Sequence, residues 1–308
     1  MVTAQLVKEL RELTGAGMMD CKKALSETNG DLKKAIDVLR EKGLSSAAKK
    51  SGRIAAEGVV SSYVSEDFSK GTLVELNCET DFVAINPLFV GLSKEICQIA
   101  QENSCEDVNE IEKLQYKFNE EFPTVKDAVV GLVAKLGENI SLRRIVNYSS
   151  NDGVVNNYIH GDGKIGVMVE LKSNLKNEEV SKVAKDICMQ IAATNPLSIS
   201  VDDVDSEIVE KERQILKTQA LNEGKPEQVV EKMVDGRIKK YFQEICLLEQ
   251  SFVKDPDLTV KKFIESKSKE LGTNIEIIRF SRFEKGEGIE KKEENFAEEV
   301  QKQMNKGK

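Results

Sequence analysis

Few residues in this chain have the chemistry of a catalytic or ligand-binding site. The sequence has one histidine, His160, and six cysteines without a Cys-x-x-Cys pair. The strongest local signal is an acid beside a large aromatic, Asp81-Phe82, in the run from Asn77 to Pro87. An Asp-Phe pair exposed at one point of a surface is suited to entering another protein.

The expected elements around this pair decide whether it is exposed. An apolar strand runs from Leu73 to Leu76, and Pro87 opens a new helix. Neighbouring side chains at a strand end point to opposite faces, so at least one of Asp81 and Phe82 should project from the surface. In the alternative, Asp81 caps the helix and Phe82 turns back into the core. The spacing alone leaves both interpretations open.

Composition narrows the class of protein. The chain has 308 residues, 40% apolar and 32% charged, which is typical of a soluble globular protein with two or more domains. The net charge of −8 argues against direct binding of nucleic acid, because neutralising phosphates needs a basic face. No apolar run approaches the roughly 18 residues of a membrane span, and the charged N-terminal segment is unlike a signal peptide. We therefore expect a cytoplasmic protein with no membrane partner. Its reduced cysteines should lie in the core: Cys21, Cys78, Cys97, Cys105, Cys188 and Cys246.

Motifs of catalysis are missing. The sequence has no Walker phosphate loop, no Gly-x-Ser-x-Gly and no His-Glu-x-x-His. The glycines of residues 161–166 have dinucleotide-binding spacing, but they join two expected strands rather than a strand and a helix. An enzyme with Cys78 as nucleophile is disfavoured, because the acids Glu79 and Asp81 raise the pKa of the thiol. We predict no enzyme, no catalytic residue, no metal and no cofactor.

His160 lies just before this turn, at the end of an expected strand. A lone histidine in a hairpin is by default an ordinary surface residue. The alternative is a contact residue, because hairpin tips readily meet a partner.

An internal repeat organises the middle of the chain. Residues 57–64 recur as 152–159 and residues 71–76 as 166–171, both 95 positions later. The Val-rich segments predict a β-hairpin, a helix follows, and each half closes with a second helix, a Leu-Gly turn and a strand. The unit is therefore β-β-α-α-β. The offset grows to 135 at the Leu-Gly turns, so an insertion of about 44 residues interrupts the second copy.

The insertion has helical patterns at Ser206–Asn222 and Glu227–Leu248. Between them, Gly224 is placed to end the first helix and Pro226 to begin the second. The apolar steps of four and three from Val230 are those of a coiled coil. We interpret the insertion as a protruding antiparallel helical hairpin. Two further packed helices of the second copy are the alternative.

The first 50 residues predict a separate three-helix unit. Thr3 caps a helix through Leu13, a second runs from Asp20 to Thr28, and Asp31 caps a third through Lys42. The tight loop between the first two carries Met18-Met19, adjacent thioethers suited to an adaptable apolar contact. One of them can instead complete the small core.

Three motifs give the chain a family resemblance: Leu6 to Leu25, Thr80-Asp81-Phe82-Val83-Ala84, and Gly286 to Lys291. With these it resembles the bacterial translation elongation factor Ts family, guanine nucleotide exchange factors for elongation factor Tu. The resemblance implies an α+β protein: a UBA-like three-helix domain, a core of two related β-β-α-α-β subdomains, an inserted antiparallel coiled-coil hairpin and a C-terminal helical module. The expected boundaries are 1–52 for the UBA-like domain, 53–148 for the first subdomain, 149–198 with 246–281 for the second, 199–245 for the hairpin and 282–308 for the C-terminal module.

The resemblance also implies the site residues. Thr80, Asp81, Phe82 and Val83 would enter the nucleotide domain of the partner beside its magnesium site. Arg11, Met18 and Met19 would dock the same domain, joined by a helix from Asn295 to Met304. Leu136, Gly137 and His160 would contact the partner from the core. The insert loops depart from the family pattern, which leaves open whether the coiled coil pairs two copies.

The implied function is nucleotide exchange in translation elongation: binding of GDP-bound and nucleotide-free elongation factor Tu, disruption of its magnesium and phosphate site, and release of GDP so that GTP can bind. A second hypothesis is an adaptor whose N-terminal bundle binds ubiquitin-like or other peptides on an inert core. Deleting residues 1–50 would abolish all binding by an adaptor, whereas an exchange core would keep weak binding that depends on Phe82.

Overall fold

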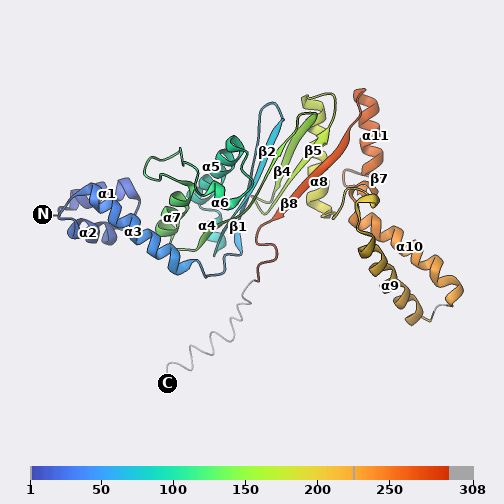
Figure 1. Ribbon diagram of the computed structural model, residues 1–308, viewed down its shortest axis with the longest axis horizontal. Helices are drawn as coiled ribbons and strands as arrows, with labels where there is room; N and C mark the ends of the chain where they lie inside the picture. Colours follow the sequence, from blue (N-terminus) through green and yellow to red (C-terminus); the bar gives the residue numbers. More distant parts are fainter. Residues whose placement is uncertain (1, 225, 291–308) are drawn as a thin grey trace, which may run out of the picture.

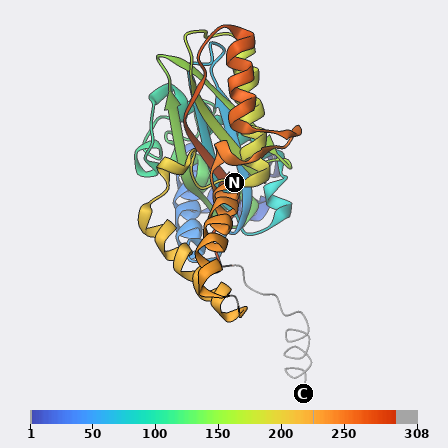
Figure 2. The same cartoon turned by 90° about the vertical axis from the view of Figure 1, so that its right-hand side faces the viewer.

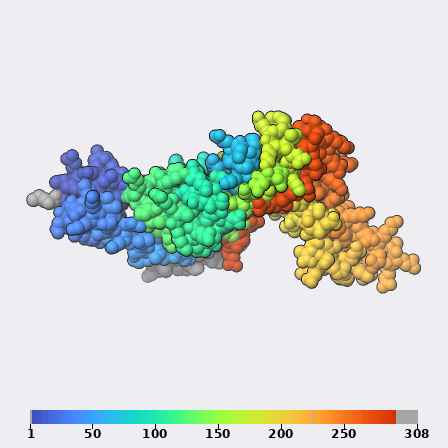
Figure 3. All heavy atoms as spheres, turned by 45° about the horizontal axis from the view of Figure 1, so that its top comes forward, coloured from blue at the N-terminus to red at the C-terminus, as the bar shows by residue number. Residues whose placement is uncertain are grey.

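The computed structural model describes residues 2–224 and 226–290 and shows an elongated α+β molecule. The N-terminal helices form one end, two sheets with their covering helices form the middle, and a pair of long helices projects near the other end (Figures 1 and 3). Within the described residues, none of the helices combines the length and the apolar composition that crossing a bilayer requires.

The helices are α1 (Ala4–Thr14), α2 (Met18–Glu27), α3 (Leu32–Lys50), α4 (Asp81–Ala84), α5 (Pro87–Asn103), α6 (Val108–Ile111), α7 (Val125–Leu136), α8 (Glu178–Thr194), α9 (Ser206–Asn222), α10 (Glu227–Ile245) and α11 (Val260–Leu271), with the 3-10 turns η1 (Val201–Asp203) and η2 (Leu247–Glu249). The strands are β1 (Glu57–Val64), β2 (Lys70–Cys78), β3 (Ile140–Ser149), β4 (Gly153–His160), β5 (Ile165–Lys172), β6 (Ser251–Phe252), β7 (Asp255–Thr259) and β8 (Glu276–Glu284).

The N-terminal bundle forms from the expected caps but with two shifted boundaries. The caps are confirmed: the side chains of Thr3 and Asp31 accept hydrogen bonds from backbone amides in the first turns of α1 and α3. The predicted starts and ends are wrong at two points. Helix α2 begins at Met18, since Gly17 is already its N-cap. Helix α3 runs past Lys42 to Lys50, because its second half packs along α7 and places Gly43 against Ala134.

Two three-stranded antiparallel sheets pack face to face in the middle of the molecule. Their strand orders are β1-β2-β3 and β4-β5-β8, so each copy of the repeat supplies one sheet. Helices α5 and α7 cover the outer face of the first sheet, and α8 and α11 cover that of the second. The space between the sheets is filled by buried side chains from both copies: Val60, Leu73, Tyr148, Val155, Met168 and Phe283.

The copies contact each other reciprocally. The amide of Val60 donates to the carbonyl of Gly163 at 2.8 Å, and the amide of Val155 donates to the carbonyl of Phe68 at 2.7 Å. Val155 and Gly163 lie 95 positions after Val60 and Phe68, so each hairpin tip crosses the first strand of the other copy in the same way. The two copies are thus related by approximate twofold symmetry. As a result, the end of β2 and the β4–β5 turn lie at the same end of the two sheets.

The inserted helices form an antiparallel hairpin that projects from the sheets, rather than packing as two further core helices (Figures 1 and 2). Its own small core contains Ala220, Val230, Val234 and Ile238. Helix α10 ends at Ile245 rather than at Leu248, because Cys246 pairs with Ser198 in a parallel bridge. A short β6–β7 hairpin, which the sequence did not predict, follows before α11.

The C-terminal boundary also differs from the prediction. Residue 282 was expected to begin a helical module, but strand β8 continues through Glu284, where it pairs with Ile165 of β5. Sheet pairing therefore extends the core by three residues. The helix expected from Asn295 to Met304 lies outside the described residues.

A close approach of backbone between β4 and β5, within the second copy, makes a prediction about stability. Gly153 begins β4, and a Cβ there would lie 1.8 Å from the carbonyl oxygen of Leu171. We expect Gly153→Ala to lower the free energy of unfolding by about 2 kcal/mol, because backbone must move to admit the methyl group. Urea denaturation measures this. The control is Gly236→Ala inside α10, where no heavy atom lies within 4 Å of the added Cβ. This change should raise the free energy of unfolding by about 0.5–1 kcal/mol. A neutral Gly153→Ala would contradict the close approach.

Candidate partner-binding surface

The Asp81-Phe82 pair is exposed, and it lies on a helix rather than on a strand end. Strand β2 ends at Cys78, and Thr80 caps the one-turn helix α4 by accepting from the amide of Val83 at 3.4 Å. The side chain of Phe82 is 78% exposed, while Val83 is buried in the core below. Of the two open interpretations, the surface one is correct. Thr80, and not Asp81, is the cap.

A carboxylate from a distant segment holds this loop in place. Glu138 Oε2 accepts from the amides of Glu79 and Thr80 at 3.1 and 3.0 Å, and Glu138 Oε1 accepts from Thr80 Oγ1 at 2.5 Å. Gly137, left-handed at φ 83°, ends α7 and directs the chain so that Glu138 faces the loop. The predicted residues Leu136 and Gly137, which directly precede Glu138, therefore lie close to the Phe82 loop.

Sequence reasoning missed Glu138, although a signal was present. Position 138 corresponds to Thr273 in the second copy, within otherwise matching Leu-Gly turns. A residue needed only for the turn would be the same kind in both copies. The contrast between Glu138 and Thr273 marks the first copy as carrying an additional role.

The other side of the loop is bound to the segments that precede β1 and β3. Glu79 Oε1 accepts from the amide of Asn139 at 2.6 Å and lies 3.4 Å from Arg53 Nη1. Asn139 Nδ2 in turn donates to the carbonyl of Arg53 at 2.8 Å. With Glu138, these contacts hold the backbone of the Phe82 loop from both sides.

The N-terminal candidates lie on the bundle. Arg11 is exposed near the end of α1, and Met18 and Met19 are 58% and 74% exposed. The sequence predicts a tight loop for the two methionines, but they occupy the first turn of α2. Neither completes the bundle core, which forms around Leu10, Leu25 and their neighbours. Both thioethers are therefore available for contact.

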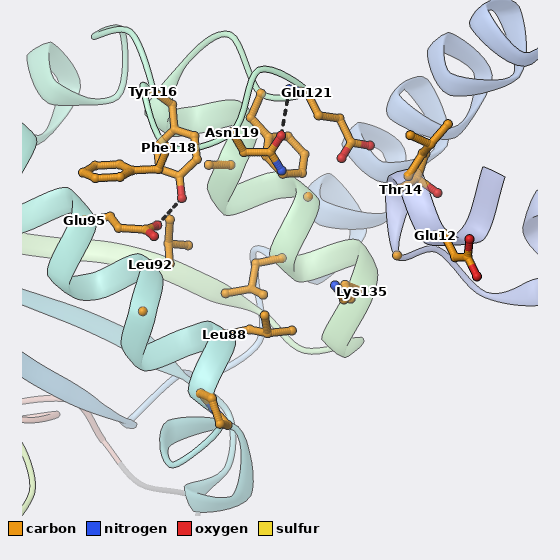
Figure 4. A pocket seen from close by; sticks show the side chains of 18 residues that line it. Glu12, Thr14, Leu88, Leu92, Glu95, Tyr116, Phe118, Asn119, Glu121 and Lys135 are labelled. Atoms are coloured by element: carbon orange, nitrogen blue, oxygen red, sulfur yellow. Dashed lines mark hydrogen bonds between the residues drawn. The ribbon is translucent and has the colours of Figure 1, made fainter. Parts of the chain in front are cut away.

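A groove separates the bundle from the core (Figure 4). It has a volume of about 440 Å³ and lies between the end of α1, the start of α5 and helix α7. Leu13 and Leu88, both about half exposed, line opposite sides, and Lys135 lies between them. The apolar surface therefore continues from the Phe82 loop through Ile85 and Leu88 toward the bundle.

His160 lies on the second sheet, apart from Leu136 and Gly137. It is exposed at the end of β4, and its Nδ1 lies 3.0 Å from the hydroxyl of Tyr158. The glycines after it form the β4–β5 turn, as predicted, and not a nucleotide loop. That turn crosses β1, so His160 lies at the same end of the two sheets as the Phe82 loop.

The described residues contain no group of three histidine, cysteine or acidic side chains that could hold a metal ion. All six cysteines are buried and free. Burial raises the pKa of the Cys78 thiol to about 12, with further contributions from the charges of Glu138 and Glu57. A thiol held protonated in this way is a poor nucleophile.

Fold and surface together define an α+β protein of two packed repeat sheets with an exposed aromatic on a loop held from two sides. The chain belongs to the Elongation factor TS family, whose family model matches residues 79–287. It is 58% identical over 306 residues to Elongation factor Ts from Clostridium botulinum, covering 99% of this chain and 100% of the relative. It is also 58% identical over 302 residues to Elongation factor Ts from Clostridium perfringens, covering 98% and 99%. Membership of this family makes the chain a translation elongation factor.

The burial of the thiols predicts their reactivity. In the native protein at pH 7.5, iodoacetamide should leave Cys78 unmodified, because the thiolate is suppressed and the side chain is inaccessible. Mass spectrometry of the intact protein measures the label. Protein unfolded in urea is the control and should take up label rapidly. Fast labelling of native Cys78 would contradict its assignment as a core residue.

The contacts of Glu138 predict the order of the Phe82 loop. Glu138→Ala should remove about 2 kcal/mol of local stabilisation, because charge-assisted hydrogen bonds to Glu79 and Thr80 are lost. Amides 79–83 should then exchange hydrogen about thirtyfold faster, measured by mass spectrometry. Glu106→Ala, at an exposed acid elsewhere in the first copy, is the control. Unchanged exchange at 79–83 would show that Glu138 does not hold the loop.

Proposed function

We propose that this chain is the guanine nucleotide exchange factor for elongation factor Tu. It binds the GDP-bound and nucleotide-free partner, disrupts the magnesium and phosphate site, and promotes GDP release so that GTP can bind. The observation that carries this proposal is Phe82, an exposed aromatic beside Asp81 on a loop fixed from two sides. Membership of the elongation factor Ts family supports the choice of partner.

The mechanism needs no bond-making by this protein, which is therefore not an enzyme in the chemical sense and uses no cofactor. An exchange factor binds the nucleotide-free partner more tightly than the nucleotide-bound one. By thermodynamic reciprocity the nucleotide then binds more weakly to the complex, by the same factor. Preferential binding of the open state is the whole source of activity.

The required preference is too large for one side chain. Weakening the nucleotide by a factor of about 10⁴ needs roughly 5.5 kcal/mol of preferential binding. Complete burial of a phenylalanine supplies about 1.5–3 kcal/mol. We therefore propose a footprint of three parts. Thr80, Asp81, Phe82 and Val83 form the wedge at the magnesium site, Arg11, Met18 and Met19 dock the nucleotide domain, and Leu136, Gly137 and His160 bind from the core.

The finer organisation is proposed on the same basis. Residues 1–52 form a UBA-like domain, and the two sheets with their helices form two related subdomains. The projecting helices act as a coiled-coil hairpin, and the residues after β8 form a C-terminal module. The protein works in the cytoplasm, with no direct contact to nucleic acid or membrane. The hairpin is the surface through which two copies would pair.

The wedge is tested by Phe82→Ala. We expect the maximal rate of GDP release from elongation factor Tu to fall at least tenfold. The reason is that the variant has no ring to insert at the magnesium site of the partner and disrupt it. Release of a fluorescent GDP analogue measures the rate. The protein should stay folded, since the ring makes little contact with its own core. Val253→Ala, an exposed apolar side chain on the β6–β7 hairpin, is the control and should keep the native rate.

Exchange by Phe82→Ala at the native rate would refute the wedge. In the same assay, we expect His160→Ala to lose less activity than Phe82→Ala, because the histidine lies at the edge of the footprint. A larger loss from His160→Ala would reverse this order.

A further inference from the structure

The repeat builds the same three-residue contact twice. In the first copy, Glu75 pairs across the sheet with Arg144, whose guanidinium stacks 4.2 Å from the ring of Phe283. In the second copy, the corresponding residues are Glu170, Arg279 and Tyr148, with the guanidinium 4.1 Å from the ring. Both acids directly precede an irregularity in the sheet. Each arginine stacks on an aromatic of the other copy.

Among the described residues, the first of these acids has further partners beyond its stacked arginine, whereas the hydrogen bond to Glu170 comes from Arg279. Glu75 is fully buried and also accepts from the amide of Gly286 at 2.7 Å and from Arg143 Nη1 at 3.1 Å. Burial alone would favour the neutral acid, but the Gly286 amide and Arg144 outweigh it and hold the pKa of Glu75 below its ordinary value. The carboxylate therefore stays charged.

These partners fix a turn that follows the last strand. Arg144 donates to the carbonyl of Glu284 at 3.0 Å and forms an ion pair with Glu287 at 3.1 Å, and Arg143 donates to the carbonyl of Glu287. Lys285 forms an ion pair with Glu57 at 2.6 Å. The second copy forms its sheet with the Glu170–Arg279 pair alone, so a sheet of this kind does not need the contacts to residues 284–287. They serve the turn at residues 285–290.

The turn lies beside the support of the Phe82 loop. A Cβ on Gly286, which has φ +70°, would lie 2.0 Å from the carbonyl oxygen of Ala56. The short segment from Arg53 to Glu57 thus contacts the turn through Ala56 and Glu57. The same segment contacts the Phe82 loop through the ion pair of Arg53 with Glu79. Glu287, Gly288 and Glu290 on this turn are exposed.

We propose that Glu75 is a positioning residue for partner binding, which fixes the exposed turn 285–290 next to the Phe82 loop as a further contact with the partner. This rests on the proposed exchange function and extends its footprint to a segment about 200 residues away in sequence. Glu75 does not touch Thr80 or Phe82, so its loss weakens the complex without removing the wedge.

The test measures GDP release from elongation factor Tu at increasing concentrations of this protein. Glu75→Gln should raise the half-saturating concentration about five- to tenfold and leave the maximal rate within twofold. Gly286→Ala should do the same, because its Cβ lifts the turn. The double variant should be no worse than either single one, since both act through one contact. Glu170→Gln, the matched control in the second copy, should leave both parameters within twofold of native.

Arg143→Ile guards against a trivial loss of folding. It installs the residue that the second copy carries at this position, Ile278, and should raise the half-saturating concentration in the same way. Circular dichroism at the assay temperature shows that each variant is folded. Equal shifts for Glu75→Gln and Glu170→Gln, or native values for Gly286→Ala and Arg143→Ile, would overturn the proposal. A native protein that fails to accelerate release would instead refute the exchange function itself.

Discussion

Each copy of the repeat lays the tip of its β-hairpin across the first strand of the other copy, and the remaining features of the molecule depend on this contact. The hydrogen bonds of Val60 to Gly163 and of Val155 to Phe68 fix the two sheets in one relative position. Apolar side chains from both copies then fill the space between them. As a result, the end of β2, the β4–β5 turn and the end of β8 meet at one end of the two sheets.

The two copies differ where a partner would be met. The first copy places Glu138 under the Phe82 loop, where the second has Thr273 bonded to Ser173. The first copy surrounds Glu75 with distant partners, whereas Glu170 keeps a single arginine partner among the described ion pairs. A buried carboxylate without partners destabilises the fold, and the hydrogen bonds of Glu75 offset this cost. The approximate twofold relation supplies a stable frame, and the departures from it lie at the proposed binding surface.

Such a frame suits a protein that acts by binding alone. Preferential affinity for one state of a partner requires contacts held in a fixed relative geometry, because a flexible surface would adapt to both states and discriminate between neither. Phe82 projects from a short helix whose cap, carboxylate support and buried neighbour Val83 are all fixed by the core. The bundle is joined to the same core through α3 and α7, including the Arg40–Asp127 ion pair at 2.7 Å.

The sequence alone determined the elements and their repetition. Caps at Thr3 and Asp31, the left-handed glycines after α7 and α11, and the hairpins were readable because each depends on neighbours in sequence. It also determined the family, through long motifs, and the acid–aromatic pair. Only the tertiary structure decided that Phe82 is exposed, that Thr80 rather than Asp81 caps the helix, that α3 continues along α7, and that Glu138 and Glu75 hold distant segments. The physical reason is that Glu138 and Glu75 bond residues 58 and 211 positions away, and that burial also depends on distant parts of the chain, which no local pattern can specify.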